Sequence, residues 1–384
     1  MSRGRQKKIL LLLEPVLAHQ RRVLIGISDY AAEHPGWRFC SWNELGRVPT
    51  VEAVSGWDVD GAIVRVQNTR FPEQAAEAGV PCVIVGTGSG GVGSSRVEPD
   101  QAMIGRLAAE HLMECGLVSF AFYGVSGYRA SSGRLDGFRA ALGEHGYVPK
   151  VLLGGGRTRR AGFEARRRWI RSLPTPVGLM AFNDLRAWDM ISSCRDAGRR
   201  VPEDVAIVGV DNDDLVCRVV NPPISSVDTN AERIGYEAAG LLARMMRGRD
   251  KQTQVIVEAN GVIARKSSDV LALDDAAAAA AVRFVREHVQ DRIDVSAVVD
   301  HVSLSRRALE RRFKAATGRA LGEEIRLSRL NRARGLLLDS ALALERIAEA
   351  SGFLDAKQMG AAFRKYLRTS PMKYRRDHVR RTNS

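Results

Sequence analysis

The chain of 384 residues is long enough for two or three domains with buried cores. Its content of 45% hydrophobic and 27% charged residues is that of a globular protein and excludes a disordered chain. No apolar run approaches the roughly 18 residues of a membrane-spanning helix, and Ile9–Leu13 is too short for a secretion signal, so we expect a cytoplasmic protein with no membrane partner.

The net charge of +14 is concentrated near the C-terminus. Residues 275–384 hold 23 Lys and Arg against 13 Asp and Glu, a net charge of +10, whereas the residues before them have a net charge of +4. A basic domain next to a nearly neutral one indicates that the C-terminal part binds a polyanion.

Strand-like and helix-like segments alternate over the first 210 residues. The apolar run Lys8–Leu13 predicts a strand buried on both faces, and His19–Glu33 predicts a helix with Val23, Ile27 and Tyr30 on one side. The alternation continues with strands at 61–66, 82–85, 119–123, 151–153, 178–181 and 205–210 and helices at 71–78, 101–115, 132–146, 162–172 and 185–197. Repeated βα units predict open parallel sheets, and their number predicts two lobes.

The pattern changes after residue 210. Asn221–Asn230, which contains two prolines, predicts an extended crossing segment; a helix at 234–247 and a closing strand at 254–263 follow. Asp275 is suited to cap the alanine-rich helix after it. We expect an α/β domain over residues 7–265, a linker over 266–281 and a second domain over 282–384.

Short amphipathic helices replace the βα pattern from Asp294 onward. A helix with valines on one face leads through Ser303–Ser305 into a second helix, Arg306–Ala316, whose inner face carries Leu309 and Phe313. The i, i+4 spacing of these two apolar residues predicts the second helix, and the short connection Ser303–Ser305 predicts a tight turn between the two helices.

The same pair recurs further along the chain. A short helix opens at Ile347, Gly352 supplies the turn, and the next helix presents Met359 and Phe363 at the same spacing. A helix over 321–338 bridges the two pairs. The second helix of each pair is narrow enough to enter a DNA major groove, and a rigid spacer can set two such helices about one DNA turn, ~34 Å, apart.

The last hundred residues resemble the AraC/XylS family of transcription regulators. The resemblance runs through Ser305–Lys314, Ile347–Phe353, Phe363–Tyr366 and Thr369–Arg375. It implies an all-α double helix-turn-helix domain whose base-reading positions fall on Arg307, Glu310 and Arg311 in the first unit and on Ala356, Lys357 and Ala361 in the second. Because alanine forms no side-chain hydrogen bond, we expect the first unit to read more sequence. The full set of expected DNA contacts is Arg306, Arg307, Glu310, Arg311, Lys314, Lys357, Gln358, Arg364, Lys365 and Arg375.

Polar residues follow several predicted strands of the α/β part, where open sheets bind ligands. Asn183 follows one strand and Asp211 another, and Arg134 stands near the start of a helix. Together with Asn221–Val227, they resemble the effector domain of LacI/GalR repressors and periplasmic sugar-binding proteins. The resemblance implies two lobes that close on a sugar held by Arg134, Asn183 and Asp211. Arg21 or Arg22 is expected to face the cleft, and Arg65 is a further candidate.

No catalytic or metal centre is indicated. The five cysteines are far apart and form no CxxC pair, so we expect buried free thiols and no metal. The glycine-rich stretch Gly86–Gly93 invites a nucleotide-binding interpretation, but no helix follows it directly to point its N-terminus at a phosphate. We therefore expect no enzyme activity and no cofactor.

The fusion of the two domain types resembles the regulators of xylose operons. This resemblance implies a sugar-responsive, DNA-binding activator of a pentose operon that works as a homodimer and contacts RNA polymerase. Two alternatives stay open at this point: a ligand-independent or architectural DNA-binding protein with a vestigial sensor, and a nucleotide- or sugar-converting α/β enzyme with a DNA-binding tail.

Overall fold

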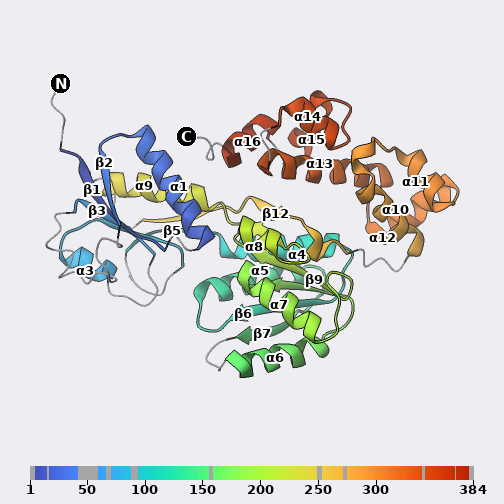
Figure 1. Cartoon of the computed structure of the whole chain (residues 1–384), viewed down its shortest axis with the longest axis horizontal. Coiled ribbons are helices and arrows are strands. Elements are labelled where there is room, and N and C mark those ends of the chain that lie inside the picture. Colours follow the sequence, from blue (N-terminus) through green and yellow to red (C-terminus); the bar gives the residue numbers. More distant parts are fainter. Residues whose placement is uncertain are drawn as a thin grey trace. The chain divides into compact units, whose positions relative to one another are not determined.

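The computed structural model of the chain divides into two compact units (Figure 1). We call them the effector unit, which comprises Met1–His111 and Ser119–Ser268, and the helical unit, which comprises Leu112–Val118 and Asp269–Ser384. The structure describes residues 5–14, 17–41, 59–65, 71–87, 94–154, 159–248, 253–270, 275–339, 342–367 and 369–379.

The first lobe of the effector unit is built on a six-stranded parallel sheet in the order β11-β5-β4-β3-β1-β2. Its strands are β1 (Lys7–Leu12), β2 (Trp37–Ser41), β3 (Gly61–Val64), β4 (Cys82–Val85), β5 (Ser95–Pro99) and β11 (Gln254–Val257). The helices of this lobe are α1 (Ala18–Glu33), α3 (Phe71–Glu77) and α9 (Ala231–Met245).

The second lobe has its own six-stranded sheet in the order β12-β10-β9-β8-β6-β7, in which only β12 pairs antiparallel. Its strands are β6 (Phe120–Val125), β7 (Lys150–Gly154), β8 (Val177–Ala181), β9 (Val205–Val210), β10 (Ser225–Asp228) and β12 (Gly261–Ile263). Its helices are α4 (Gln101–Glu114), α5 (Arg129–Gly143), α6 (Arg159–Arg171), α7 (Asp184–Asp196), α8 (Asp214–Val219) and the short η2 (Lys266–Ser268). The two-lobed α/β architecture predicted from the sequence is therefore confirmed.

The chain crosses between the lobes three times: after β5, between β10 and α9, and between β11 and β12. The third crossing corrects our prediction of a single closing strand at 254–263. The segment is two short strands; β11 pairs with β5 in the first lobe and β12 pairs with β10 in the second. The break depends on long-range pairing, because β5 lies more than 150 residues before β11 in the chain. No local sequence pattern marks its position.

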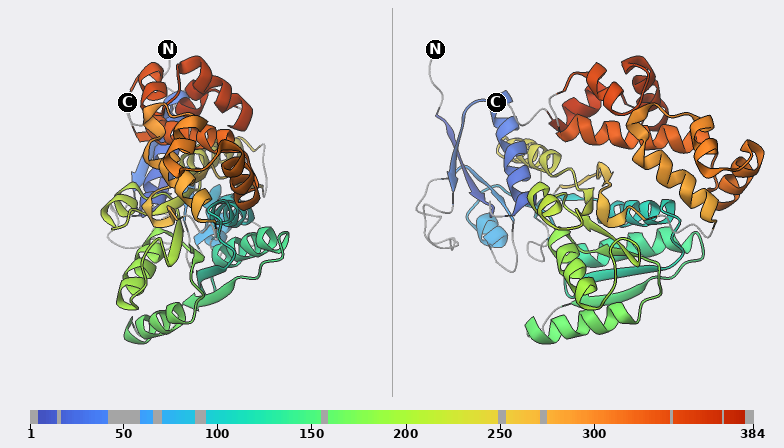
Figure 2. Two further views of the ribbon diagram at one scale, coloured as in Figure 1. Left: turned by 90° about the vertical axis from the view of Figure 1, so that its right-hand side faces the viewer. Right: turned by 45° about the vertical axis from the view of Figure 1, so that its right-hand side comes forward.

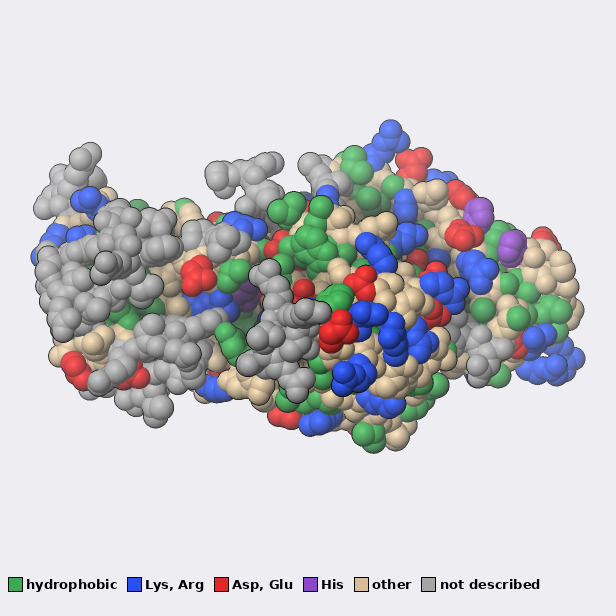
Figure 3. Space-filling view, turned by 60° about the horizontal axis from the view of Figure 1, so that its bottom comes forward, with side chains coloured by type: hydrophobic (Ala, Val, Ile, Leu, Met, Phe, Trp, Pro, Cys, Tyr) green, Lys and Arg blue, Asp and Glu red, His purple; other side chains and the backbone are tan. Residues whose placement is uncertain are grey.

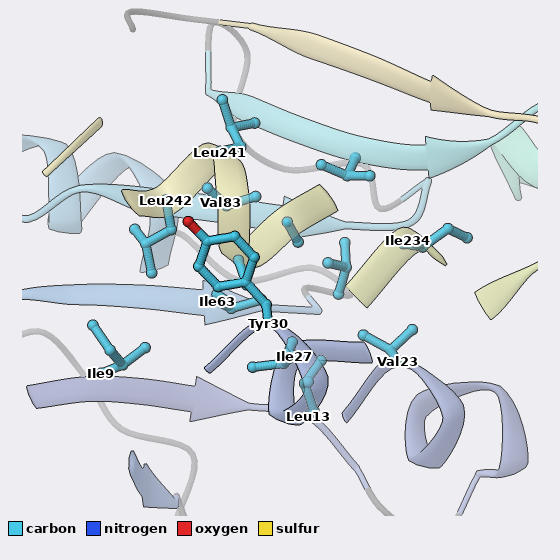
Figure 4. Close-up of a cluster of buried hydrophobic side chains, with 14 of the residues drawn as sticks. Ile9, Leu13, Val23, Ile27, Tyr30, Ile63, Val83, Ile234, Leu241 and Leu242 are labelled. Atoms are coloured by element: carbon cyan, nitrogen blue, oxygen red, sulfur yellow. The ribbon is translucent and has the colours of Figure 1, made fainter. Parts of the chain in front are cut away.

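Strand residues alternate between the two faces of the first sheet. Ile9 and Ile63 pack with α1 and α9 on one face, whereas Leu10 and Val64 pack with α3 on the other. Figure 4 shows the first of these clusters, in which the Tyr30 ring lies among side chains from the strands and from α9. Burial on both faces explains why Ile9–Leu12 of β1 are all apolar.

Helices α1 and α9 approach each other very closely, through glycines. A Cβ atom on Gly26 would lie 1.8 Å from the carbonyl oxygen of Glu232, and one on Gly235 would lie 1.9 Å from the carbonyl oxygen of Val23. Neither carbonyl can move without bending its helix, so the helix pair depends on both glycines.

We predict that Gly26→Ala lowers the free energy of unfolding by about 1–3 kcal/mol or more, because the added methyl group forces the two helices apart. Urea unfolding measures this change. Gly143→Ala is the matched control, since a Cβ there meets no atom within 4 Å. Equal stability of the two variants would contradict the close packing of α1 on α9.

The helical unit contains two small cores that share one long helix. Figures 1 and 2 show α13 (Leu321–Asp339) running from the helices α10 to α12 toward the helices α14 to α16. Leu321 and Ile325 of α13 enter the first core, and Leu330 and Leu337 enter the second. The other helices are α10 (Ala276–Glu287), α11 (Val295–Val302), α12 (Arg306–Thr317), α14 (Leu344–Ala350), α15 (Ala356–Leu367) and α16 (Pro371–Val379).

The connection between the units is shorter than the linker expected at 266–281. Ser267 is buried in the effector unit, where its hydroxyl donates to the Ile207 carbonyl at 2.6 Å. At the other end Asp275 caps α10, and Ala278 and Ala281 are buried in the first helical core. The sequence predicted the α10 helix and its Asp275 cap, but the alanine-rich composition did not indicate that the helix packs into a core.

Candidate functional site

A cavity of about 370 Å³ lies in the effector unit at the ends of strands from both lobes. The N-termini of α1, α5 and α7 reach it, through His19, Arg129 and Asn183 among others. Four of the residues that the sequence predicts as ligand contacts line this cavity: Arg65, Arg134, Asn183 and Asp211. The volume falls in the usual range for small-molecule sites, roughly 300–1,000 Å³.

Arg134 is held rigidly in the wall of the cavity and is 5% exposed. Its Nε donates to Gln101 Oε1 at 2.8 Å, one terminal nitrogen donates to the carbonyl oxygen of Phe182, and the other lies 3.9 Å from Asp211 Oδ1. The guanidinium also stands 4.8 Å from the centre of the Phe182 ring. A buried arginine fixed by these partners can present its remaining N–H group to a ligand hydroxyl.

Asp211 follows β9 in a left-handed conformation, with φ of 101°. Its backbone N–H still donates to the Val227 carbonyl at 3.0 Å, so the residue turns its side chain out of the sheet while the backbone remains bonded. Burial raises the pKa of Asp211, and the nearby Arg134 opposes that shift. Non-glycine residues with positive φ are concentrated at functional sites.

Asn183 and Asp184 shape the neighbouring wall. Asn183 Oδ1 accepts from the backbone N–H of Arg186 at 3.0 Å and caps α7, which leaves its amide N–H groups for the cavity. The buried Asp184 accepts from Ser226 Oγ at 2.6 Å and from the backbone N–H of Asp213 at 2.8 Å. Asp184 thereby ties together the ends of β8, β9 and β10. Burial raises its pKa to about 8.

The two candidates on α1 have different surroundings. Arg21 is exposed and does not line the cavity. Arg22 bonds to Asp228 at 3.0 Å and to Glu232 at 3.1 Å, and thus ties α1 to the crossing between β10 and α9. Its acidic partners lie about two hundred residues away in sequence, where no motif marks them.

Gln101 and His19 also line the cavity, and sequence reasoning did not select them as ligand contacts. Gln101 begins α4 directly after the first crossing between the lobes. Its place at the cavity follows from the path of the chain, and no sequence motif indicates it. Burial, followed by the charge of Arg65, lowers the pKa of His19 to about 3, so this side chain is neutral at physiological pH. Its Nδ1 lies 3.2 Å from Thr229 Oγ1.

The neutral state of His19 predicts a pH dependence of stability. An unfolded histidine titrates near pH 6.5, so below that pH the unfolded chain binds a proton that the folded chain does not, and stability falls as pH falls. We expect this loss to reach about 2 kcal/mol at pH 5. Urea unfolding between pH 5 and 7.5 should give a flatter profile for His19→Gln than for wild type, whereas the exposed control His145→Gln should follow wild type.

The first helix-turn-helix unit consists of α11 and α12. Ser303 adopts a left-handed conformation at the turn, and Ser305 caps α12 by accepting from the Ala308 N–H at 3.3 Å. Leu309 and Phe313 are fully buried. All five residues expected to contact DNA from this helix are exposed: Arg306, Arg307, Glu310, Arg311 and Lys314.

The charges on α12 are not equally available. Arg306 Nε bonds to Glu310 at 3.0 Å. Within the described residues, the side chains of Arg307, Arg311 and Lys314 make no hydrogen bond or ion pair. These three cations are the freest on the helix to meet a base edge or a phosphate.

The second unit consists of α14 and α15, with Met359 and Phe363 fully buried. Lys357, Gln358, Arg364 and Lys365 are exposed. Gln358 Oε1 accepts from the Leu354 N–H at 3.0 Å, so its oxygen serves the local turn. Within the described residues, the side chains of Lys357, Arg364 and Lys365 make no hydrogen bond or ion pair, so this unit has as many unpaired cations as the first.

Several arginines of the helical unit stabilise its fold. Arg375 donates to the carbonyl oxygens of Leu342 and Leu337, at 2.5 and 3.4 Å. Arg332 similarly reaches the Ala350 carbonyl at 2.6 Å, and Arg312 pairs with Asp275 at 2.6 Å. Blue Lys and Arg side chains stand at several separate places in Figure 3, so charge alone does not mark α12 and α15.

Other chemistry is not indicated in the described parts of the chain. There, no group of three or more His, Cys, Asp or Glu is placed to hold a metal ion, and all five cysteines are buried and unpaired with one another. No helix in those parts is long and apolar enough to span a bilayer. Gly88–Gly93 of the glycine-rich stretch lies outside the described residues; the strand β5 follows it.

Two domain families match the sequence. A periplasmic binding protein-like domain matches residues 95–268, and a helix-turn-helix domain matches residues 298–377. Among solved structures, one described as the xylose-binding transcription activator xylR has a TM-score of 0.62 and 28% identity, covering 97% of this chain and 98% of its own. A CelR–cellobiose complex has a TM-score of 0.56 and 26% identity, covering 68% of this chain and 85% of its own.

Full-length relatives match both domains together. The xylose operon regulatory protein of Escherichia coli (strain K12) is 30% identical over 384 residues, which cover 97% of each chain. That of Haemophilus influenzae (strain KW20) is 27% identical and covers 96% of this chain and 98% of its own. The chain belongs to the family of xylose operon regulatory proteins.

Proposed function

We propose that the chain is a transcription activator that binds a pentose-class monosaccharide in the effector cavity and DNA through α12 and α15. The observation that carries the proposal is the convergence of Arg134, Asn183 and Asp211 on one cavity, in a chain that also holds two exposed basic reading helices. The relatives named for the xylose operon support a pentose as the ligand class.

The polar groups of the cavity suit a compound with several neighbouring hydroxyls. The Arg134 N–H donates to a hydroxyl oxygen, and the Asp211 carboxylate accepts from hydroxyl protons. The Asn183 amide donates a further bond, since its oxygen is used by the cap of α7. Such matched donors and acceptors reject compounds that lack the corresponding hydroxyl.

The proposed mechanism is a change in DNA affinity upon sugar binding. Because residues of both lobes line the cavity, a sugar that bonds to both favours one arrangement of the lobes over another. We further propose that the protein acts in the cytoplasm as a homodimer that contacts RNA polymerase. A coupling free energy of about 1–3 kcal/mol would change DNA affinity roughly 5- to 150-fold.

The test is a thermal-shift and calorimetry panel of pentoses, hexoses and their derivatives with the full chain, followed by DNA binding with and without the ligand found. We expect at least one compound of the pentose class to raise the melting temperature and to change the DNA affinity. If no sugar or sugar derivative binds at millimolar concentration, the sensor is vestigial and the protein is a ligand-independent DNA-binding protein.

A further inference from the structure

The last residues of the effector unit are fastened to the start of β10. We call residues 265–268 the exit segment, because the helical unit begins with the next residue. The backbone N–H of Ser225 donates to Ser267 Oγ at 2.9 Å. Ser225 Oγ in turn accepts from Ser268 Oγ and from the backbone N–H of Arg265, both at 2.7 Å. The exit segment is therefore fixed to the second lobe by a set of short hydrogen bonds.

The Arg265 side chain joins the exit segment to the loop after β9. One terminal nitrogen donates to the Ile224 carbonyl at 2.9 Å, and the other donates to Asn212 Oδ1 at 2.8 Å. Asn212 directly follows Asp211, which lines the ligand cavity, whereas neither Asn212 nor Arg265 is among the lining residues. A single residue thus stands between the exit segment and a candidate ligand contact.

The backbone at this point has an unusual conformation. The φ angles of Asp211 and Asn212 are 101° and 49°, two successive positive values at residues other than glycine. Such a backbone costs free energy and persists only where its surroundings hold it. The Asn212 N–H donates to Ser226 Oγ at 3.0 Å, and the Asn212 amide adds its bond to Arg265. A ligand that bonds to the Asp211 carboxylate therefore acts on a turn that specific side-chain bonds keep in place.

The other end of the Asn212 amide reaches a crossing between the lobes. Its nitrogen donates at 3.3 Å to Asp228 Oδ2, at the end of β10, where the chain leaves for α9. The same carboxylate accepts from Arg22 of the first lobe at 3.0 Å. Burial opposes the ionisation of Asp228, but the charge of Arg22 outweighs it and lowers the pKa of this carboxyl. Asn212 thus connects an ion pair that spans both lobes with the exit segment.

We propose that the Asn212 amide and the Arg265 guanidinium form the link through which an occupied cavity changes DNA affinity. A ligand moves Asn212 through its neighbour Asp211 or through a shift of the first lobe that reaches Asp228. The short bond to Arg265 passes that movement to the exit segment, since coupling between sites is transmitted by contiguous hydrogen-bond networks. This inference rests on the proposed function, because it assigns the response of that same cavity to two positioning residues that do not touch the sugar.

The test measures three quantities on the full-length protein. They are the affinity for a pentose, the affinity for DNA without pentose, and the ratio of DNA affinities with and without saturating pentose, which we call the coupling ratio. The pentose probes are D-xylose, D-ribose and L-arabinose, and the DNA is an operator selected from random sequences by the wild-type protein. For the pentose that the wild type binds most tightly, we expect a change in DNA affinity of about 5- to 150-fold.

Arg265→Leu removes the guanidinium and leaves the backbone bond to Ser225 in place. We expect the DNA affinities with and without pentose to come within about twofold of each other, whereas pentose affinity stays within about threefold of wild type, because Arg265 lies outside the cavity lining. Asn212→Gly removes the amide at a position where glycine adopts the positive φ without strain, and it should abolish the response equally.

Arg195→Leu is the matched control. Arg195 is an exposed arginine of the same lobe that also donates to a backbone carbonyl, that of Asn221 at 3.2 Å, but it does not bond to the exit segment. This variant should keep the whole coupling ratio. Arg265→Lys should reduce the ratio in part, because an ammonium keeps the charge but lacks the planar fork that reaches Asn212 and the Ile224 carbonyl together.

The outcomes separate this inference from the proposed function. A wild-type coupling ratio in folded Arg265→Leu and Asn212→Gly overturns the inference and leaves the proposed function intact. A lower melting temperature and weaker binding of both pentose and DNA, with the ratio unchanged, also overturns it, because the two residues then serve the fold alone. If Arg265→Leu fails to fold, Arg265→Lys decides, and an unchanged ratio there counts against the link. If no pentose alters DNA binding by the wild type, the proposed function itself fails.

Discussion

Arg134→Lys should weaken binding of the effector sugar by about 10- to 150-fold, as expected for the loss of hydrogen bonds from a charged group worth roughly 1.5–3 kcal/mol. Lysine keeps the positive charge, so the change tests the planar hydrogen-bonding geometry of arginine and not its charge. It lacks the planar fork that spans Gln101, the Phe182 carbonyl and the cavity at once. Calorimetry with the ligand found in the panel measures the change.

Arg139→Lys is the matched control, since Arg139 lies on the same helix and is exposed. It should bind ligand as the wild type does. The melting temperature of each variant without ligand shows whether Arg134→Lys also loosens the cavity wall. Ligand affinity within threefold of wild type for Arg134→Lys would mean that this arginine is structural and that other groups hold the sugar.

The βα alternation in the sequence was sufficient to predict the two parallel sheets and most of their helices. Most buried strands are marked by an apolar run, as expected for burial on both faces. Strands β5 (SRVEP) and β10 (SSVD) are exceptions, because they are fully buried and yet carry polar and charged side chains. The break between β11 and β12 was not predictable, because the division of 254–263 depends on pairing with β5 and β10 in different lobes. Strands β2 (Trp37–Ser41) and β5 (Ser95–Pro99) were missed because their sequences mix polar or charged residues with apolar ones.

The ligand site was partly predictable for a similar reason. Arg134, Asn183 and Asp211 stand at strand ends or helix starts, and topology brings such positions together at one edge of a sheet. The environment of α1 was not predictable at the level of single residues. Arg21 and Arg22 are neighbours in sequence, but only Arg22 meets Asp228 and Glu232, which arrive from β10 and α9.

In the helical unit, the sequence predicted which faces are buried but not how its arginines divide their roles. The i, i+4 apolar pairs of α12 and α15 are buried as expected. Arg375, which we expected at the DNA, donates to two backbone carbonyls. An arginine that satisfies carbonyls at a helix end and one that meets a phosphate look alike in a sequence, because both are basic residues near a turn.

Arg307→Ala should lower affinity for the cognate operator by about 1–3 kcal/mol and relax specificity at one base pair, while leaving non-specific affinity nearly unchanged. The reason is that Arg307 is exposed on α12 and, within the described residues, its guanidinium makes no hydrogen bond or ion pair that would hold it away from a base edge. The operator is first selected from random DNA with the wild-type protein, and affinities are then measured at fixed salt for every single-base variant.

The matched control is Arg283→Ala, which removes an exposed arginine of α10, outside both helix-turn-helix pairs. It should leave the base preference unchanged. Lys357→Ala on α15 provides the comparison between units: because Ala356 and Ala361 flank it and Gln358 serves the local turn, its effect on specificity should be smaller than that of Arg307→Ala. Equal loss of specificity from the two variants would contradict the uneven division of sequence reading, and a uniform loss of affinity for Arg307→Ala would assign this arginine to the phosphate backbone.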